Sequence, residues 1–199
     1  MKQKILVHLC CAICGVALIE KLRENFEPTI FFYNPNIYPA EEYNKRKEAV
    51  VELAKIYGID FVSAQGASVQ DGSASGVRLA SGWEGEYEKW REKTKGKEQE
   101  PEQGSRCYDC FKMRLEKSAE FAKENGFEIF TTSLFVSPFK NEKVVNEVGK
   151  KVSEKYGIKF LEMEKVIEDK TENWKKTRDL SKKYDFYSQK YCGCIFSKR

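Results

Sequence analysis

The stretch "KILVHLCCAICGVALIEKLRENFEPTIFFYN", residues 4–34, decides the fold class by its pattern alone. Residues 4–9 are a short apolar run rich in aliphatic side chains, which is typical of a buried strand. Residues 15–25 follow the helical period, and residues 29–34 repeat the strand pattern. The sequence therefore predicts a strand, a helix and a second strand, which together form a βαβ unit with parallel strands.

The same alternation continues along the chain. Helical patterns cover residues 39–57, 84–96, 107–125, 141–156 and 172–184. Strand patterns cover residues 59–62, 127–133 and 158–163. Strands that alternate with helices favour a parallel sheet with helices on both faces, so we predict an α/β, Rossmann-like fold. Residues 63–83 are rich in Ser, Gly and Ala without periodicity, and we expect a long flexible loop or insertion there.

The length of 199 residues, of which 41% are hydrophobic and 33% charged, suits a single α/β domain over residues 1–199. Residues 172–199 are expected to form a C-terminal helix and tail of that domain. No apolar run approaches the length of a membrane span, and the segment before the first cysteine is too short for a signal peptide. We therefore expect a cytoplasmic protein that makes no contact with a membrane.

All seven cysteines lie in three tight clusters, namely Cys10, Cys11 and Cys14, then Cys107 and Cys110, then Cys192 and Cys194. In a reducing compartment, such clusters indicate a metal, a metal cluster or redox catalysis rather than structural disulfides. The odd number of cysteines agrees with this interpretation, because pairing into disulfides would leave one thiol unpaired.

The first cluster lies between the first predicted strand and the helix that follows, where open α/β sheets bind ligands. The positive end of a helix dipole lowers the pKa of nearby thiols and stabilises an anionic group. Cys107 and Cys110 have CxxC spacing at another helix start, so we expect both groups to converge on one site. Two plus two thiolates suit either a zinc ion, including a structural one, or a 4Fe-4S cluster.

The pair Cys192 and Cys194 is separated by a single glycine. A disulfide between them closes a small strained ring, and strain raises the reduction potential. The pair is therefore a poor structural crosslink and a good labile redox couple. His8, the only histidine, lies in the first predicted strand, where a core role and a functional role are both open.

Basic residues gather toward the C-terminus. Residues 140–199 hold 16 Lys and Arg against 10 Asp and Glu, whereas residues 1–139 hold 19 against 21. A solvated helical face explains such a surplus. Phosphate binding explains it equally well, because lysines release counterions from nucleic acid on contact.

Five motifs together resemble one enzyme family. They are His8-x-Cys10-Cys11-x-x-Cys14, "YNPNIYPAEEYNKR" (33–46), "RCYDCFKMRL" (106–115), "FTTSLFVSPFKN" (130–141) and "YSQKYCGC" (187–194). Their order resembles the QueH family of epoxyqueuosine reductases, over nearly the whole chain outside residues 63–83. The resemblance implies a nucleotide-hydrolase-like Rossmann fold. It also implies reduction of epoxyqueuosine to queuosine at the wobble position of tRNA, the last step of queuosine biosynthesis.

The resemblance further implies a cofactor and roles for the cysteines. A 4Fe-4S cluster would be bound by Cys10, Cys11, Cys107 and Cys110, with Cys14 left to bind that cluster or an additional iron ion. Cys192 and Cys194 correspond to a redox-active pair that an external electron donor resets.

Removing an epoxide oxygen as water takes two electrons and two protons, so the reaction needs a proton donor. Asp109 and Tyr191 are the candidates for that role. Residues expected to bind the anticodon loop are His8, Tyr33, Tyr38, Lys140, Arg178 and Tyr191, and Trp90 and Tyr187 are further candidates to stack on an extruded base. A place in the core is the alternative for these aromatic residues.

The chain departs from the expected family pattern at three positions, since Ile13 replaces a proline and Tyr38 and Phe139 replace histidines. Two other functions remain open at this stage. One is an RNA-binding module stabilised by zinc or an iron-sulfur cluster and without catalysis, which a visible spectrum and the iron content test. The other is a small-molecule thiol oxidoreductase, whose activity does not depend on tRNA.

Overall fold

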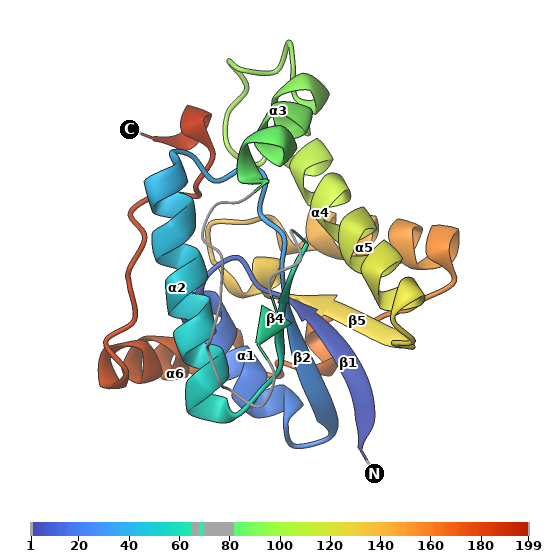
Figure 1. The fold of residues 1–199 in the computed structure, drawn as a ribbon, viewed down its shortest axis with the longest axis vertical. Helices are drawn as coiled ribbons and strands as arrows, with labels where there is room; N and C mark the ends of the chain where they lie inside the picture. The colour runs from blue at the N-terminus through green and yellow to red at the C-terminus, as the bar shows by residue number, and fades with distance from the viewer. Residues whose placement is uncertain (1, 65–67, 70–81, 199) are drawn as a thin grey trace.

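A computed structural model describes residues 2–64, 68–69 and 82–198, and it has an α/β fold around one sheet (Figure 1). The strands are β1 (Gln3–His8), β2 (Phe26–Phe32), β3 (Phe61–Ser63), β4 (Ser68–Val69), β5 (Ile129–Thr132) and β6 (Lys159–Phe160). Their order in the sheet is β4-β3-β2-β1-β5-β6, and every pair is parallel except β3 with β4. The predicted Rossmann-like class is confirmed. The antiparallel edge strand β4 lies inside the segment predicted as a loop, most of which is outside the described residues.

The described helices are α1 (Ala12–Leu22), α2 (Ala40–Tyr57), α3 (Trp83–Lys93), α4 (Ser105–Glu124), α5 (Glu142–Tyr156) and α6 (Lys170–Lys183). Short 3-10 helices follow β5 and β6 and end the chain, namely η1 (Ser133–Val136), η2 (Met163–Lys165) and η3 (Ile195–Ser197). Each predicted helix is present, but α1 begins at Ala12 rather than Gly15. The reason is that the side chain of Cys11 caps this helix by accepting a hydrogen bond from the amide of Cys14.

Helices cover both faces of the sheet. Helices α1, α2 and α6 gather on one side, with α1 packed against α6, and α4 and α5 pack together on the other (Figure 1). Between them, the central strand β1 buries Ile5, Leu6 and Val7 completely. Helix α4 buries one stripe at helical spacing, namely Phe111, Leu115, Ala119 and Ala122. None of the described helices is both long enough and apolar enough to cross a membrane.

The direction in which the chain winds reverses at β1. From this strand the chain moves outward to β2 and β3, and it later returns to β5 on the other side of β1. In open α/β sheets, the crevice at the carboxyl ends of two such strands is the usual place for a ligand. The turn that leads into α1 and the segment that begins with η1 both lie at this point.

His8 joins three segments at this edge of the sheet. The hydroxyl of Thr132 donates to Nδ1 over 2.8 Å, and Nε2 donates to the carbonyl of Tyr33 over 3.0 Å. Burial, aided by the nearby charge of Arg114, lowers the pKa of His8 to about 3, so the ring is neutral. Both ring nitrogens are engaged and the side chain is fully buried. This geometry gives no support to the substrate contact expected of His8 from the sequence, and that role stays a prediction.

We predict that Thr132→Val lowers the free energy of unfolding by about 1–3 kcal/mol, because two buried groups lose their partner. These are Nδ1 of His8 and the amide of Leu134, which donates to the Thr132 hydroxyl over 3.1 Å. Thr132→Ser keeps the hydroxyl and is the matched control. Urea unfolding measures both variants, and equal stability of Thr132→Val and the unmodified protein contradicts the prediction.

Candidate metal and substrate site

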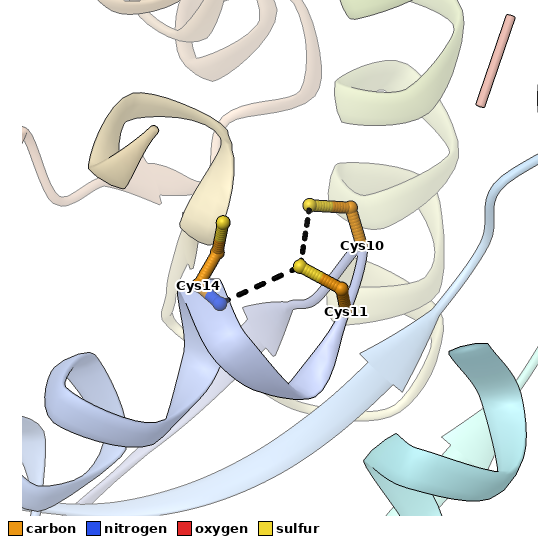
Figure 2. Close-up of side chains that lie close together, drawn as sticks. All are labelled: Cys10, Cys11 and Cys14. Atoms are coloured by element: carbon orange, nitrogen blue, oxygen red, sulfur yellow. Dashed lines mark hydrogen bonds between the residues drawn. The ribbon is translucent and has the colours of Figure 1, made fainter. Parts of the chain in front are cut away.

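Three cysteines converge where β1 passes into α1. Cys10 and Cys11 lie just after the strand, and Cys14 lies in the first turn of the helix (Figure 2). Their three sulfur atoms lie within 4.8 Å of one another, and all three side chains are buried. The sulfurs of Cys10 and Cys11 are 3.8 Å apart. This distance is too long for a disulfide and matches the roughly 3.8 Å between two thiolates that share a tetrahedral ion at about 2.3 Å. The trio can therefore bind a metal ion.

The surroundings of this trio favour negative charge. Donation from the neighbouring thiols of Cys11 and Cys14 lowers the pKa of Cys10, and the cations Lys140 and Arg114 add to the effect. Hydrogen bonds among the three thiols raise the pKa of Cys14, and they raise the pKa of Cys11 to about 12. The protein alone thus stabilises one thiolate, on Cys10, and it supplies cations to balance the others when a metal displaces their protons.

A second group of cysteines surrounds a small cavity. Cys107 and Cys110 come from the start of α4, and Cys192 and Cys194 come from the C-terminal segment. The volume of this cavity is about 30 Å³, which is room for about one water molecule. Burial raises the pKa of Cys110 to about 12 and that of Cys194 to about 11. These two thiols are therefore protonated at neutral pH, and all seven cysteines of the chain are free of disulfides.

Lys140 connects the two cysteine groups. It follows η1, lines the small cavity, and interacts electrostatically with Cys10, Cys14 and Cys192. Burial by itself lowers the pKa of Lys140, but its electrostatic interactions with the cysteines outweigh burial and raise the pKa overall. A permanent cation thus lies between the trio and the C-terminal pair.

A large cleft opens beside these cysteines. Its volume is about 940 Å³, which lies within the usual range for ligand sites. Cys14 and Cys192 lie in its wall, and Cys192 and Phe139 line both this cleft and the small cavity. The wall also contains five cations and five aromatic rings, namely Lys45, Arg178, Lys182, Lys190 and Lys198, with Phe139, Trp174, Phe186, Tyr187 and Tyr191.

Comparison with known protein families gives a match over nearly the whole chain. The sequence profile described as "Epoxyqueuosine reductase QueH" matches residues 5–199. The chain belongs to this family. It is similar to the epoxyqueuosine reductase QueH of Haemophilus influenzae, with 37% identity over 205 residues, covering 99% of this chain and 72% of the relative. For that of Thermotoga maritima the identity is 34% over 199 residues, covering 97% and 89%. For that of Streptococcus pyogenes serotype M1 it is 33% over 199 residues, covering 100% and 72%.

In this QueH chain, the cysteines do not form the expected group of two residues from the first cluster and two from the CxxC motif. Cys14 joins Cys10 and Cys11, and among the described residues no fourth cysteine sulfur lies within 4.8 Å of all three. Cys107 and Cys110 instead share their cavity with the C-terminal pair. Binding of one cluster by Cys10, Cys11, Cys107 and Cys110 therefore stays a prediction.

Of the other predicted residues, Arg178, Tyr187 and Tyr191 line the cleft. Tyr38 precedes the lining residue Pro39 and is 37% exposed, with its ring stacked on Tyr87 at a centroid distance of 5.1 Å. Trp90 is fully buried and lines the small cavity.

Two predicted residues lie away from both cavities. The hydroxyl of Tyr33 is used in a 2.7 Å hydrogen bond to Glu86, and only 2% of the residue is exposed. The carboxylate of Asp109 forms an ion pair with Lys97. Neither residue lines the cleft or the small cavity, so the proton donor role of Asp109 gains no support from its position.

The buried cations of the QueH site were not predicted from the sequence. Arg106, Cys110 and Arg114 are spaced four residues apart on α4, so a helix places all three on one face. Arg114 donates to the side-chain oxygen of Asn34 over 2.5 Å, and Arg106 lines the small cavity. The four-residue spacing around the CxxC motif is the signal in the sequence that could have identified these cations. Nothing local identifies Gln189, whose amide lies 3.0 Å from the sulfur of Cys11.

We predict that Cys11→Ser and Cys14→Ser each lower the affinity for iron by at least about tenfold, because each removes a thiolate from the trio. Iron and sulfide per chain, measured after anaerobic reconstitution, report the loss. Ile13→Val, in the same turn, is the control and should bind as the unmodified protein does. Full iron content in Cys14→Ser removes that residue from the ligands.

Proposed function

We propose that this chain reduces the epoxide of epoxyqueuosine to the alkene of queuosine within the anticodon loop of tRNA. In this proposal Cys192 and Cys194 supply the electrons, and the other cysteines bind an iron-sulfur cluster. The observation that carries the proposal is the position of Cys192, which faces both the large cleft and the cysteine-lined cavity. A redox thiol there can reach a ligand in the cleft and its own partner Cys194.

The donor set fits a 4Fe-4S cluster. Each thiolate of such a cluster binds a different iron, so its ligands need not lie as close together as those of one ion. Cys107 and Cys110 can therefore complement Cys10 and Cys11, which leaves Cys14 for an additional iron. The buried Arg114 and the half-buried Lys140 balance the thiolate charge. The side chains that close the 30 Å³ cavity have to turn aside on loading. When bound, the iron centre supplies a Lewis acid for the epoxide oxygen.

The two C-terminal thiols balance the reaction. Conversion of the epoxide to an alkene and one water consumes two electrons and two protons. Cys192 and Cys194 release two electrons and two protons as their S–S bond forms, and an external reductant then restores both thiols. Because the pKa of Cys194 is about 11, this thiol carries its proton at neutral pH. Tyr191, in the wall of the cleft, remains a candidate to pass a proton to the departing oxygen.

The wall of the cleft suits a nucleic acid loop. Five lysine and arginine side chains line it and can neutralise phosphates, although Glu41, Glu42, Glu102 and Asp185 line it as well. Phe139 is 73% exposed at the border between the cleft and the small cavity. An exposed ring in that place can stack on an unpaired base, which is the usual mode of recognition for single-stranded RNA.

We predict that Cys192→Ala keeps its iron and its colour but loses turnover, because a lone thiol cannot close the disulfide that balances the reaction. Iron per chain and queuosine formed are measured in the same preparation, and Ile195→Val, which lines neither cavity, is the control in the same segment. Loss of iron together with activity makes Cys192 a metal ligand instead. Undiminished multiple turnover refutes both roles.

We predict that binding of the tRNA anticodon stem-loop weakens by about tenfold or more between 50 and 200 mM salt, since each neutralised phosphate contributes roughly 0.7–0.9 to the log-log slope. Replacing Lys182 and Lys190 in the cleft by Gln should reduce that slope by between one and two. Lys151→Gln, on the exposed surface of α5, is the control. Binding that is insensitive to salt contradicts the assignment of the cleft to tRNA and favours the free nucleoside as substrate.

A further inference from the structure

The segment that carries the redox pair has little structure of its own. Between the end of α6 and η3, the described chain forms neither helix nor strand. It runs alongside α2 toward the carboxyl edge of the sheet (Figure 1). Something outside the segment must therefore fix Cys192 and Cys194 in place, since free loop residues sample many conformations.

The guanidinium of Arg46 binds this segment. Its Nη2 donates to the carbonyl of Tyr191 over 2.9 Å, and its Nη1 donates to the carbonyl of Cys192 over 3.1 Å. The Nε of the same group donates to Glu42 over 2.7 Å, and the second oxygen of Glu42 accepts from the hydroxyl of Tyr187 over 2.5 Å. The side chain of Arg46 is only 2% exposed, and its charge lies 5.5 Å from the centre of the Tyr191 ring.

The glycine between the two cysteines fits tightly against the same arginine. Gly193 has φ +102°, and a Cβ there would lie 2.9 Å from Ile37 and 3.1 Å from Nη1 of Arg46. The amide of Tyr38 donates to the carbonyl of Gly193 over 2.9 Å, and the hydroxyl of Tyr191 donates to the carbonyl of Tyr38. Consecutive carbonyls from residue 191 to 193 are thus bound by α2 and by the turn before it.

We propose that Arg46 is a positioning residue for the redox pair, because its planar fork holds the backbone of Tyr191 and Cys192. With that backbone fixed, Cys192 stays at the junction of the cleft and the small cavity, within reach of Cys194. Lysine cannot replace it, since an ammonium is a point charge without the fork that binds two carbonyls and a carboxylate at once. This inference rests on the proposed redox role of Cys192 and Cys194.

Arg46→Lys and Arg46→Met test it, the first keeping the charge and the second removing it. Lys55→Met, at the exposed end of α2, is the matched control. Two readouts use the iron-loaded protein without substrate. They are the alkylation rates of Cys192 and Cys194, followed by mass spectrometry, and their disulfide content in glutathione buffers of graded potential.

We expect both Arg46 variants to keep their iron and to shift the disulfide equilibrium or the alkylation rate of Cys192 by at least about tenfold, because charge-assisted hydrogen bonds to the segment are lost. Turnover of tRNA should fall mainly in kcat. Wild-type alkylation rates and disulfide content in Arg46→Lys overturn the proposal, even if activity falls. Gly193→Ala displaces the same backbone and should show the same shift, so the test stands if Arg46→Met does not fold.

The two readouts separate this inference from the proposed function. Neither requires turnover, so a redox role that fails in Cys192→Ala leaves the positioning test intact. If the pair closes no disulfide in the unmodified protein, the proposed electron source is wrong. The alkylation rate of Cys192 then decides alone whether Arg46 positions the segment.

Discussion

The parallel pairing of β1 with both β2 and β5 is the constraint on which the functional half of this molecule depends. Because three strands end at the same edge of the sheet, the residues that follow each of them must meet there. His8 reinforces this arrangement by bonding to Thr132 and to the carbonyl of Tyr33. The trio Cys10, Cys11 and Cys14 therefore lies on an edge whose geometry the interior of the protein fixes.

Charge balance is the second organising feature. Arg46, Arg106 and Arg114 are each no more than 2% exposed, and burying cations is costly unless they are paired and hydrogen-bonded. Their partners are the backbone of the loops around the cysteines, a carboxylate, and the thiolates themselves. The same arginines thus hold the loops in place and balance the negative charge of thiolates that bind a metal.

The C-terminal segment joins these features to the chemistry. Gln189 contacts the sulfur of Cys11, and Cys192 borders both the cleft and the small cavity. The segment lies on α2 rather than adding a strand to the sheet. Side chains thus hold Cys192 and Cys194 in place, with Cys192 in the wall of the 940 Å³ cleft. The proposed redox role depends on this arrangement.

The sequence by itself determined the fold class, the positions of the helices, the clustering of cysteines and the family. These features depend on local periodicity, short motifs and their order along the chain, which a reader of the sequence sees directly. Only the tertiary structure decided which clusters meet. It placed Cys14 with Cys10 and Cys11, put Cys107 and Cys110 beside Cys192 and Cys194, and paired Asp109 with Lys97.

These spatial contacts could not be predicted from the sequence, for a physical reason. The contact between Arg46 and the carbonyl of Cys192 joins residues 146 positions apart in the chain, and no periodicity carries information over such a separation. Every residue has a backbone carbonyl, so a side chain that binds carbonyls requires no particular residue type and produces no sequence motif. The strand β4 was missed because it has two residues and pairs only at the edge of the sheet. Long-range packing decides all of these features.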